Sequence, residues 1–135
     1  MANFRSDHPL GIIILATLEL GNAIWNGLRL CEAIFFWTVL EKYHASPLYL
    51  ALTGAFWFVV ASILAIGLWG KKKWAWAGTL IGISCYGGWY WLDRLTVELP
   101  HANWPFALGF SILLLGISLL ILFSGKTRAY FNLVK

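Results

Sequence analysis

Residues 10–30, LGIIILATLELGNAIWNGLRL, form an apolar stretch that nevertheless contains four charged or amide side chains. A helix of about 20 residues is long enough to cross the hydrocarbon core of a bilayer. The four side chains are Glu19, Asn22, Asn26 and Arg29, separated by three, four and three residues. This spacing places them on one face of a helix. Because a polar face towards lipid is costly, the sequence predicts that other helices of the protein cover it.

The composition of the chain indicates lipid as its main solvent. Its 135 residues are 60% hydrophobic and 12% charged, and the mean hydropathy is +0.73. Soluble domains typically contain about 25% charged residues. The formal net charge of +4 does not indicate nucleic-acid binding, because the basic residues lie in short polar segments between apolar stretches. The length allows one membrane domain, residues 1–135.

Three further apolar stretches predict the helices that cover the polar face. The predicted spans are approximately residues 10–30, 47–69, 74–92 and 104–124. Ser46 and Pro47 match a helix N-cap followed by proline at the first helical position. No Gly or Pro interrupts residues 31–43, so the first helix either extends beyond the membrane or is followed by an interfacial helix. The predicted fold class is therefore an all-α bundle of four transmembrane helices.

The distribution of basic residues predicts the orientation of this bundle. Cytoplasmic segments of membrane proteins carry an excess of Lys and Arg. Seven basic residues lie at the amino end, after the second span and in the tail, and three lie in the other segments. The seven are Arg5, Lys71, Lys72, Lys73, Lys126, Arg128 and Lys135, and the three are Arg29, Lys42 and Arg94. Both termini are accordingly predicted to be cytoplasmic.

Glu19 is the first candidate for a functional residue, because it lies about nine residues into its span and hence near mid-membrane. A carboxyl at that depth either takes part in transport, by exchanging a proton for a cationic substrate, or donates a structural hydrogen bond to a neighbouring helix. The third span offers hydroxyl groups as partners for Glu19 and the two asparagines. These predicted partners are Thr79, Ser84, Tyr86 and Tyr90.

Two further features concern packing. Arg29 and Asp93 each lie about nineteen residues into spans of the same direction, so they are predicted to form an ion pair near one membrane surface. Small residues on the third and fourth spans allow helix backbones to approach closely. The predicted packing positions are Gly78, Gly82, Gly87, Gly88, Gly109 and Gly116.

The sequence predicts no resident cofactor and no metal site. The three histidines, His8, His44 and His101, lie in loops or at helix ends rather than inside a span, whereas a membrane haem usually needs a histidine within one. Trp25 and Trp57 lie deeper than the interfacial tryptophans and are candidates for contact with a quinone, a carotenoid or lipid. Bound lipid is expected. The chain contains none of the common catalytic motifs, so an enzyme is not expected.

Three segments together carry a resemblance to a known family. They are HPLGIIILATLELGNAI at 8–24, GLWGKKKWAWAGTLIG at 67–82 and FSGKTRAYF at 123–131. The chain resembles small uncharacterised four-span bacterial integral membrane proteins, which open with a PLG-aliphatic segment, carry a basic-Trp-Ala turn and end in a basic-Ala-aromatic-Phe tail. The resemblance implies a four-helix membrane domain in a prokaryotic plasma membrane. It implies no activity and no site residues.

Three functions are compatible with these features. The first is a non-enzymatic accessory or structural subunit of a larger membrane complex, or a small homo-oligomer, whose partners are membrane lipid and other membrane subunits or a second copy of the chain. The second is a proton-coupled small-molecule carrier that uses Glu19. The third is a pigment- or quinone-contacting subunit of a photosynthetic or respiratory complex. Apolar residues around several spans favour the first of these.

Overall fold

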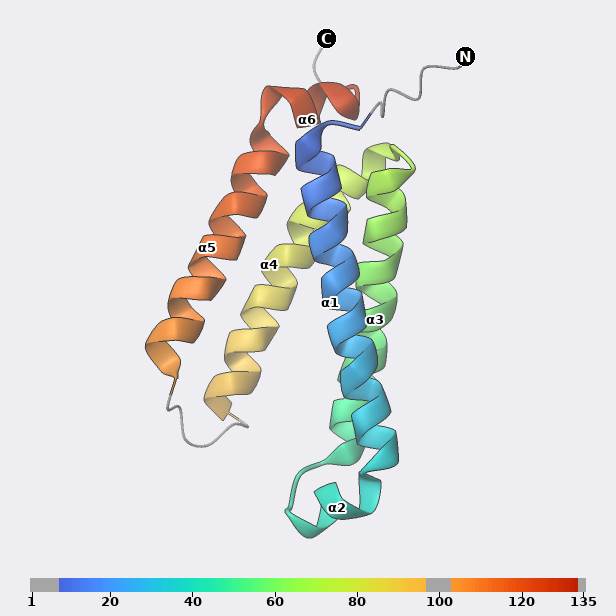
Figure 1. Ribbon diagram of the computed structural model, residues 1–135, viewed down its shortest axis with the longest axis vertical. Coiled ribbons are helices and arrows are strands. Elements are labelled where there is room, and N and C mark those ends of the chain that lie inside the picture. The colour runs from blue at the N-terminus through green and yellow to red at the C-terminus, as the bar shows by residue number, and fades with distance from the viewer. Residues whose placement is uncertain (1–7, 97–102, 134–135) are drawn as a thin grey trace.

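The computed structural model describes residues 8–96 and 103–133, and every regular element in these ranges is a helix. The predicted residues Arg5, His101 and Lys135 lie outside them. The helices are α1 (Leu10–Phe35), α2 (Trp37–Lys42), α3 (Pro47–Trp69), α4 (Lys73–Thr96), α5 (Trp104–Phe123) and α6 (Gly125–Tyr130). The four long helices run alternately in opposite directions, while α2 and α6 lie at opposite ends of the molecule (Figure 1).

Three of the described helices, α1, α3 and α5, are long and apolar enough to cross a membrane. This finding supports an all-helical membrane protein. The helix α4 is not among the three, although its 24 residues would reach across a bilayer at a rise of about 1.5 Å each. Its sequence contains several glycines and has Asp93 and Arg94 in its last turn, which lower its apolar character.

After residue 30 the chain remains helical and then forms a second, short helix. The helix α1 continues to Phe35 and then breaks at Phe36, whose φ of −106° and ψ of 25° leave the helical region. The short helix α2 follows and lies at the end of the molecule away from the two termini (Figure 1). The chain turns back through His44, which has a positive φ of 58°, and α3 begins at Pro47 with Ser46 as N-cap. The Ser46 hydroxyl accepts a hydrogen bond from the backbone N–H of Tyr49 at 3.3 Å, as the predicted cap requires.

The closest helix pair is formed by α1 and α3. Gly54 lies directly against the α1 backbone: a Cβ atom added there would be 3.0 Å from the Asn26 carbonyl oxygen and 3.0 Å from the Leu30 nitrogen. Ala23 and Ala61 are also buried. The packing glycines predicted from the sequence lie on α4 and α5 and do not include Gly54. The smallest residue at the contact, not the number of small residues in a helix, determines how closely two backbones approach.

The hydrophobic core lies at the end of the bundle that carries α6. It includes buried side chains from all four long helices and from the carboxyl-terminal segment. These are Ile12, Leu15, Ala16, Leu68, Ala75, Leu122, Tyr130 and Phe131. The indole N–H of Trp76 in α4 donates to the backbone carbonyl of Leu122 in α5 at 2.9 Å. At this end, therefore, α5 is firmly joined to the other helices.

Contacts around Tyr130 bring three distant segments to the same end. The Nδ1 atom of His8 lies 2.7 Å from the Tyr130 hydroxyl, and the His8 ring stacks on Trp69 with centroids 4.8 Å apart. The Lys71 ammonium group lies 5.1 Å from the centre of the Tyr130 ring. Burial raises the pKa of the Tyr130 phenol above its ordinary value, so the hydroxyl keeps its proton at neutral pH. The start of α1, the lysine turn and α6 consequently share one end, as the predicted order of spans requires (Figure 1).

Candidate functional site: a cavity beside Glu19

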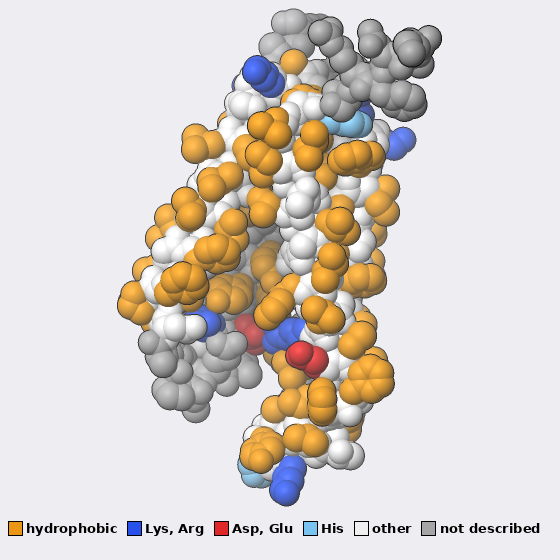
Figure 2. All heavy atoms as spheres, viewed as in Figure 1, with side chains coloured by type: hydrophobic (Ala, Val, Ile, Leu, Met, Phe, Trp, Pro, Cys, Tyr) orange, Lys and Arg blue, Asp and Glu red, His pale blue; other side chains and the backbone are white. Residues whose placement is uncertain are grey.

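A cavity of about 890 Å³ lies between the four long helices. Figure 2 shows this face of the molecule hollowed between α5 and α1. Two hydrogen bonds join α5 to α4 near the ends of α5, Trp76–Leu122 and Arg94–Asn103. Between them, a Cβ atom added to Gly109 or Gly116 would meet nothing within 4 Å among the described residues. Gly82, Gly87 and Gly88 of α4 line the cavity, and a Cβ atom on Gly87 or Gly88 would likewise meet nothing within 4 Å in the described part of the chain. Ligand sites in proteins typically measure about 300–1,000 Å³, so this one has the size of a drug-like molecule.

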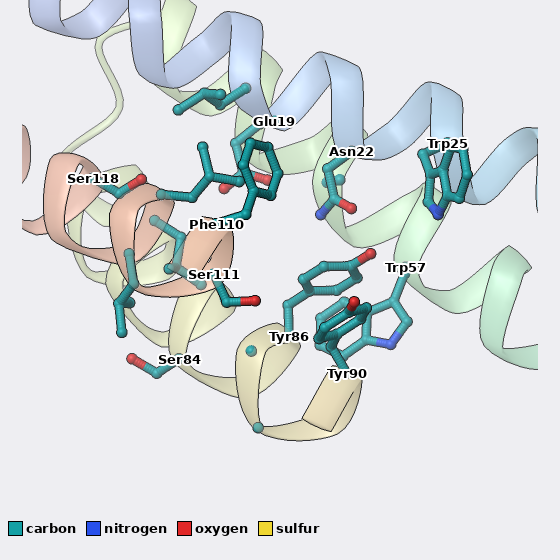
Figure 3. Close-up of a pocket in the computed structure, with 18 of the residues that line it drawn as sticks. Glu19, Asn22, Trp25, Trp57, Ser84, Tyr86, Tyr90, Phe110, Ser111 and Ser118 are labelled. Atoms are coloured by element: carbon teal, nitrogen blue, oxygen red, sulfur yellow. The ribbon is translucent and has the colours of Figure 1, made fainter. Parts of the chain in front are cut away.

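The carboxyl group of Glu19 is the central polar feature of the cavity. The residue is only 7% exposed, and its side chain extends from α1 towards α5, where Ser118 and Phe110 lie (Figure 3). Within residues 8–96 and 103–133 no hydrogen bond or ion pair involves this carboxyl group. The Glu19 oxygens are not among the fully buried polar atoms that lack a hydrogen bond, so the carboxyl group is open to the cavity. A carboxylate in apolar surroundings favours a polar or positively charged partner.

The remaining residues of the polar face are turned inward, as predicted. Asn26 is fully buried, and its Nδ2 group donates to the backbone carbonyl of Asn22 at 2.9 Å and to the Asn22 side-chain oxygen at 2.8 Å. The same group lies 3.5 Å from the hydroxyl of Tyr86 in α4. Asn22 lines the cavity between Glu19 and Trp25 (Figure 3). The two amides thus form a local pair on α1, and Glu19 does not take part in it.

The hydroxyl groups predicted to satisfy this polar face mostly have other roles. Ser84 donates to the Leu80 carbonyl of its own helix at 2.9 Å. The Tyr90 hydroxyl accepts from Arg94 at 3.2 Å, and the Thr79 hydroxyl is buried without a hydrogen bond among the described residues. Of the four predicted partners only Tyr86 contacts the polar face, through Asn26. The prediction failed because a hydroxyl side chain in a helix can also donate to the backbone carbonyl one turn earlier in the same helix. Residue spacing does not distinguish this hydrogen bond from one to a neighbouring helix.

The predicted ion pair between Arg29 and Asp93 is present. The Arg29 Nη2 atom lies 3.1 Å from Asp93 Oδ2. A residue that the sequence did not suggest, Tyr49 of α3, donates to Asp93 Oδ1 at 2.6 Å. The indole of Trp89 donates to the Tyr49 hydroxyl at 3.2 Å, and the Arg29 guanidinium lies 5.1 Å from the centre of the Trp89 ring. This network, called here the Asp93 network, joins α1, α3 and α4.

Aromatic side chains form much of the cavity wall. Trp57 is buried, and its ring contacts Tyr86 and Trp89 with centroids 5.0 and 5.7 Å apart. Trp25, also predicted to lie deeper than the interfacial tryptophans, lines the cavity and is otherwise exposed on the surface of the bundle. The cavity is also lined by Tyr90, Trp91, Phe106 and Phe110. Among residues 8–96 and 103–133, the charged residues that line it are Glu19 and Arg94, and Arg94 donates hydrogen bonds to Tyr90 and Asn103.

The six glycines predicted to pack helices divide into two groups. A Cβ atom on Gly78 or Gly82 would lie 3.0 or 2.7 Å from Leu64 of α3, so these two glycines do allow α3 and α4 to approach. Gly87, Gly88, Gly109 and Gly116 have no such neighbour: a Cβ atom would meet nothing within 4 Å among the described residues. For these four, the predicted packing is not found within the chain. Gly87 and Gly88 line the cavity instead.

Comparison with protein-family models, curated proteins and solved structures finds no match to this chain. The class of this protein is therefore described from its own fold and cavity. It is an all-helical protein with three helices able to cross a membrane, and a buried carboxyl faces a cavity between its helices.

Proposed function

We propose that this protein is a proton-coupled membrane carrier that binds a lipophilic cation in the cavity and exchanges it for a proton on Glu19. The observation behind the proposal is the Glu19 carboxyl, which is 7% exposed, faces about 890 Å³ of cavity and has no partner within the described chain. A carboxylate in apolar surroundings is favoured only when a proton or a positive charge neutralises it. The cation and the proton therefore compete for the same carboxylate.

The walls of the cavity support a cationic substrate with an apolar body. The faces of Trp57, Tyr86 and Phe110 carry negative quadrupole charge that attracts cations. Aliphatic side chains such as Leu15, Val60 and Leu114 complete the wall and suit an apolar body. A neutral quinone or carotenoid, or a lipid acyl chain, would match these apolar walls equally well. None of them would compensate the charge of Glu19, and this difference favours the cation.

Ethidium provides a test, since it is a planar aromatic cation that has no proton to lose at neutral pH. We expect the purified chain in detergent to bind ethidium and to release protons into unbuffered solution. Replacing Glu19 by Gln removes a charge-assisted contact, so the affinity is expected to fall more than tenfold and the proton release to disappear. The matched control is Glu32→Gln, an exposed carboxyl at the far end of α1, which is expected to leave both unchanged.

The sign of the pH dependence follows from the competition. Because the bound cation replaces a proton, the ethidium affinity of the unaltered chain is expected to rise with pH until Glu19 is ionised in the free protein. The affinity of Glu19→Gln is expected to be independent of pH over the same range. In proteoliposomes, an acidic lumen is expected to drive ethidium accumulation through the unaltered chain only. Binding and uptake by Glu19→Gln at the unaltered level would overturn the proposal.

The proposal also assigns the membrane topology. We place four spans, α1, α3, α4 and α5, across the bilayer, with the α6 end and both termini in the cytoplasm. Exposed Lys71, Lys72 and Lys73 lie at that end, where an excess of positive charge is expected. The polar groups of α4 that lower its hydropathy are Asp93 and Arg94, and both are buried against other parts of the chain.

Labelling with a membrane-impermeant thiol reagent tests this topology. The background variant is Cys31→Ser with Cys85→Ser, both exposed free cysteines. Lys72→Cys and His44→Cys are then added one at a time. We expect Lys72→Cys to react in inverted vesicles but not in intact cells, and His44→Cys to do the reverse. Reaction of both positions from the same side would contradict the four-span arrangement.

A second candidate function is an accessory subunit of a larger membrane assembly. It is favoured by Gly109 and Gly116 of α5, which have open space around them and could accept a helix from another chain. An assembly of this kind predicts a partner that co-purifies in mild detergent and is lost in Gly109→Leu with Gly116→Leu. The carrier predicts that the same double variant still binds ethidium.

A further inference from the structure

The α6 end of the molecule carries a concentration of exposed positive charge. Five basic side chains are exposed there: Lys71, Lys72, Lys73, Lys126 and Arg128. The acidic residues in the described part of the chain lie elsewhere. Glu19 is in the middle of α1, and Glu41 is in α2. Glu32 and Asp93 lie near the carboxyl ends of α1 and α4, away from α6. In Figure 2 the acidic side chains accordingly lie away from the α6 end. This end therefore attracts anions, and no described carboxylate offsets the attraction.

A groove of about 330 Å³ lies between the start of α1 and the corner where α5 meets α6. Its lining is apolar along the two long helices and polar at the corner. The lining residues are Pro9, Leu10, Gly11, Leu120, Ile121, Ser124, Lys126 and Thr127. Leu10 and Leu120 are 73% and 77% exposed, so the groove opens on the outer surface of the bundle and continues the apolar surface of α5.

The corner holds Lys126 at the rim of the groove. The chain turns at Ser124, whose side chain caps α6 by accepting from the backbone N–H of Thr127 at 3.3 Å. The Thr127 hydroxyl is buried and lies 3.0 Å from the Ser124 hydroxyl. Lys126, the residue before Thr127, is exposed and lines the groove. An apolar slot that opens to the outside of the bundle and has a cation at its cytoplasmic rim matches an anionic amphiphile.

We propose that this groove binds one anionic phospholipid, with the headgroup phosphate beside Lys126 and an acyl chain along Leu10 and Leu120. The charge of the α6 end selects the anionic headgroup, and the apolar part of the groove selects a lipid over a soluble phosphate. The anionic lipid would also hold this end at the cytoplasmic leaflet. The proposal does not depend on Glu19 or on the cavity, so its failure would leave the carrier proposal unaffected.

Native mass spectrometry of the full chain in detergent tests the proposal. The probes are phosphatidylglycerol and phosphatidylcholine with identical acyl chains. We expect phosphatidylglycerol to bind more than tenfold more tightly. Lys126→Gln is expected to weaken phosphatidylglycerol binding about fivefold, the effect of one basic residue near a membrane surface. Lys42→Gln, an exposed lysine at the opposite end in α2, is the control and is expected to change nothing.

A second pair of variants tests the acyl-chain part of the groove. Leu120→Trp places a larger ring in the groove and is expected to weaken phosphatidylglycerol binding, because the acyl chain loses its contact with the groove and lies in the detergent instead. Leu113→Trp, at an exposed position of α5 that does not line the groove, is expected to have no effect. Equal binding of the two lipids, equal losses in Lys126→Gln and Lys42→Gln, or displacement of the lipid by glycerol 3-phosphate at the same concentration would each overturn the proposal.

Discussion

Replacing Gly54 by valine is expected to destabilise the protein by about 3 kcal/mol. At this position a Cβ atom alone would lie 3.0 Å from two backbone atoms of α1, the Asn26 oxygen and the Leu30 nitrogen. Backbone atoms of a helix cannot rotate away as a side chain can, so the two γ-methyl groups of valine force α1 and α3 apart. Gly54→Ala adds only the Cβ atom and is expected to cost about 1 kcal/mol.

Equilibrium unfolding in mixed micelles with sodium dodecyl sulfate, followed by circular dichroism, measures this effect. The matched control is Gly109→Val, because Gly109 is also in a long apolar helix but has open space around it. The control removes the intrinsic difference between glycine and valine in a helix from the comparison. If Gly54→Val and Gly109→Val unfold at the same detergent fraction, the close α1–α3 contact is incorrect.

The second large effect is expected from Asp93→Ala. Asp93 is 6% exposed and accepts from both Arg29 and Tyr49, at 3.1 and 2.6 Å. Its removal leaves the Arg29 guanidinium, which is 23% exposed, and the Tyr49 hydroxyl without their partner. Breaking a buried ion pair from one side costs about 3–5 kcal/mol. Since Arg29 is partly exposed, we expect a loss at the lower limit, about 3 kcal/mol.

A double-mutant cycle separates the loss of the pair from the cost of the unmatched charge. Arg29→Met and Asp93→Leu are each expected to destabilise alone, whereas the double variant is expected to recover much of the loss, because neither charge of the pair then remains. The control is Glu41→Ala, which removes only the exposed Trp37–Glu41 hydrogen bond and should stay within about 0.5 kcal/mol. Additive losses in the double variant would show that the two side chains do not interact.

Sequence reasoning succeeded where a pattern had one physical cause. The polar face of α1 had to be turned inward because lipid does not solvate it, and Glu19 and Asn26 are buried. Arg29 and Asp93 were paired from helix rise alone, because two helices in the same direction reach the same depth after equal numbers of residues. The end of α3 and the start of α5 were likewise marked by Gly70 and by Trp104-Pro105.

It failed where several residues compete for one role. Many small residues on α4 and α5 suggested close packing, yet it is Gly54 of α3 whose added Cβ atom would meet the backbone of another long helix. Hydroxyl groups on α4 were assigned to Glu19, but whether a hydroxyl faces its own helix or a neighbour depends on helix rotation, which the sequence does not give. The cavity was not predicted, because it results from the distance between the middle of α5 and the other long helices, which the sequence does not give. The spacing of Ser111 and Ser118, two turns apart on one face of α5, was the available signal.

The central claim is that the Glu19 carboxyl faces an open cavity inside the membrane region and carries a proton that a cation replaces. Dicyclohexylcarbodiimide tests it most directly, because this apolar reagent modifies protonated carboxyl groups that it can reach from the bilayer. We predict one adduct on the peptide that contains Glu19, none in Glu19→Gln, and protection by ethidium that strengthens as the pH rises. Absence of the adduct, or an adduct that forms at the same rate with and without ethidium, would contradict the claim.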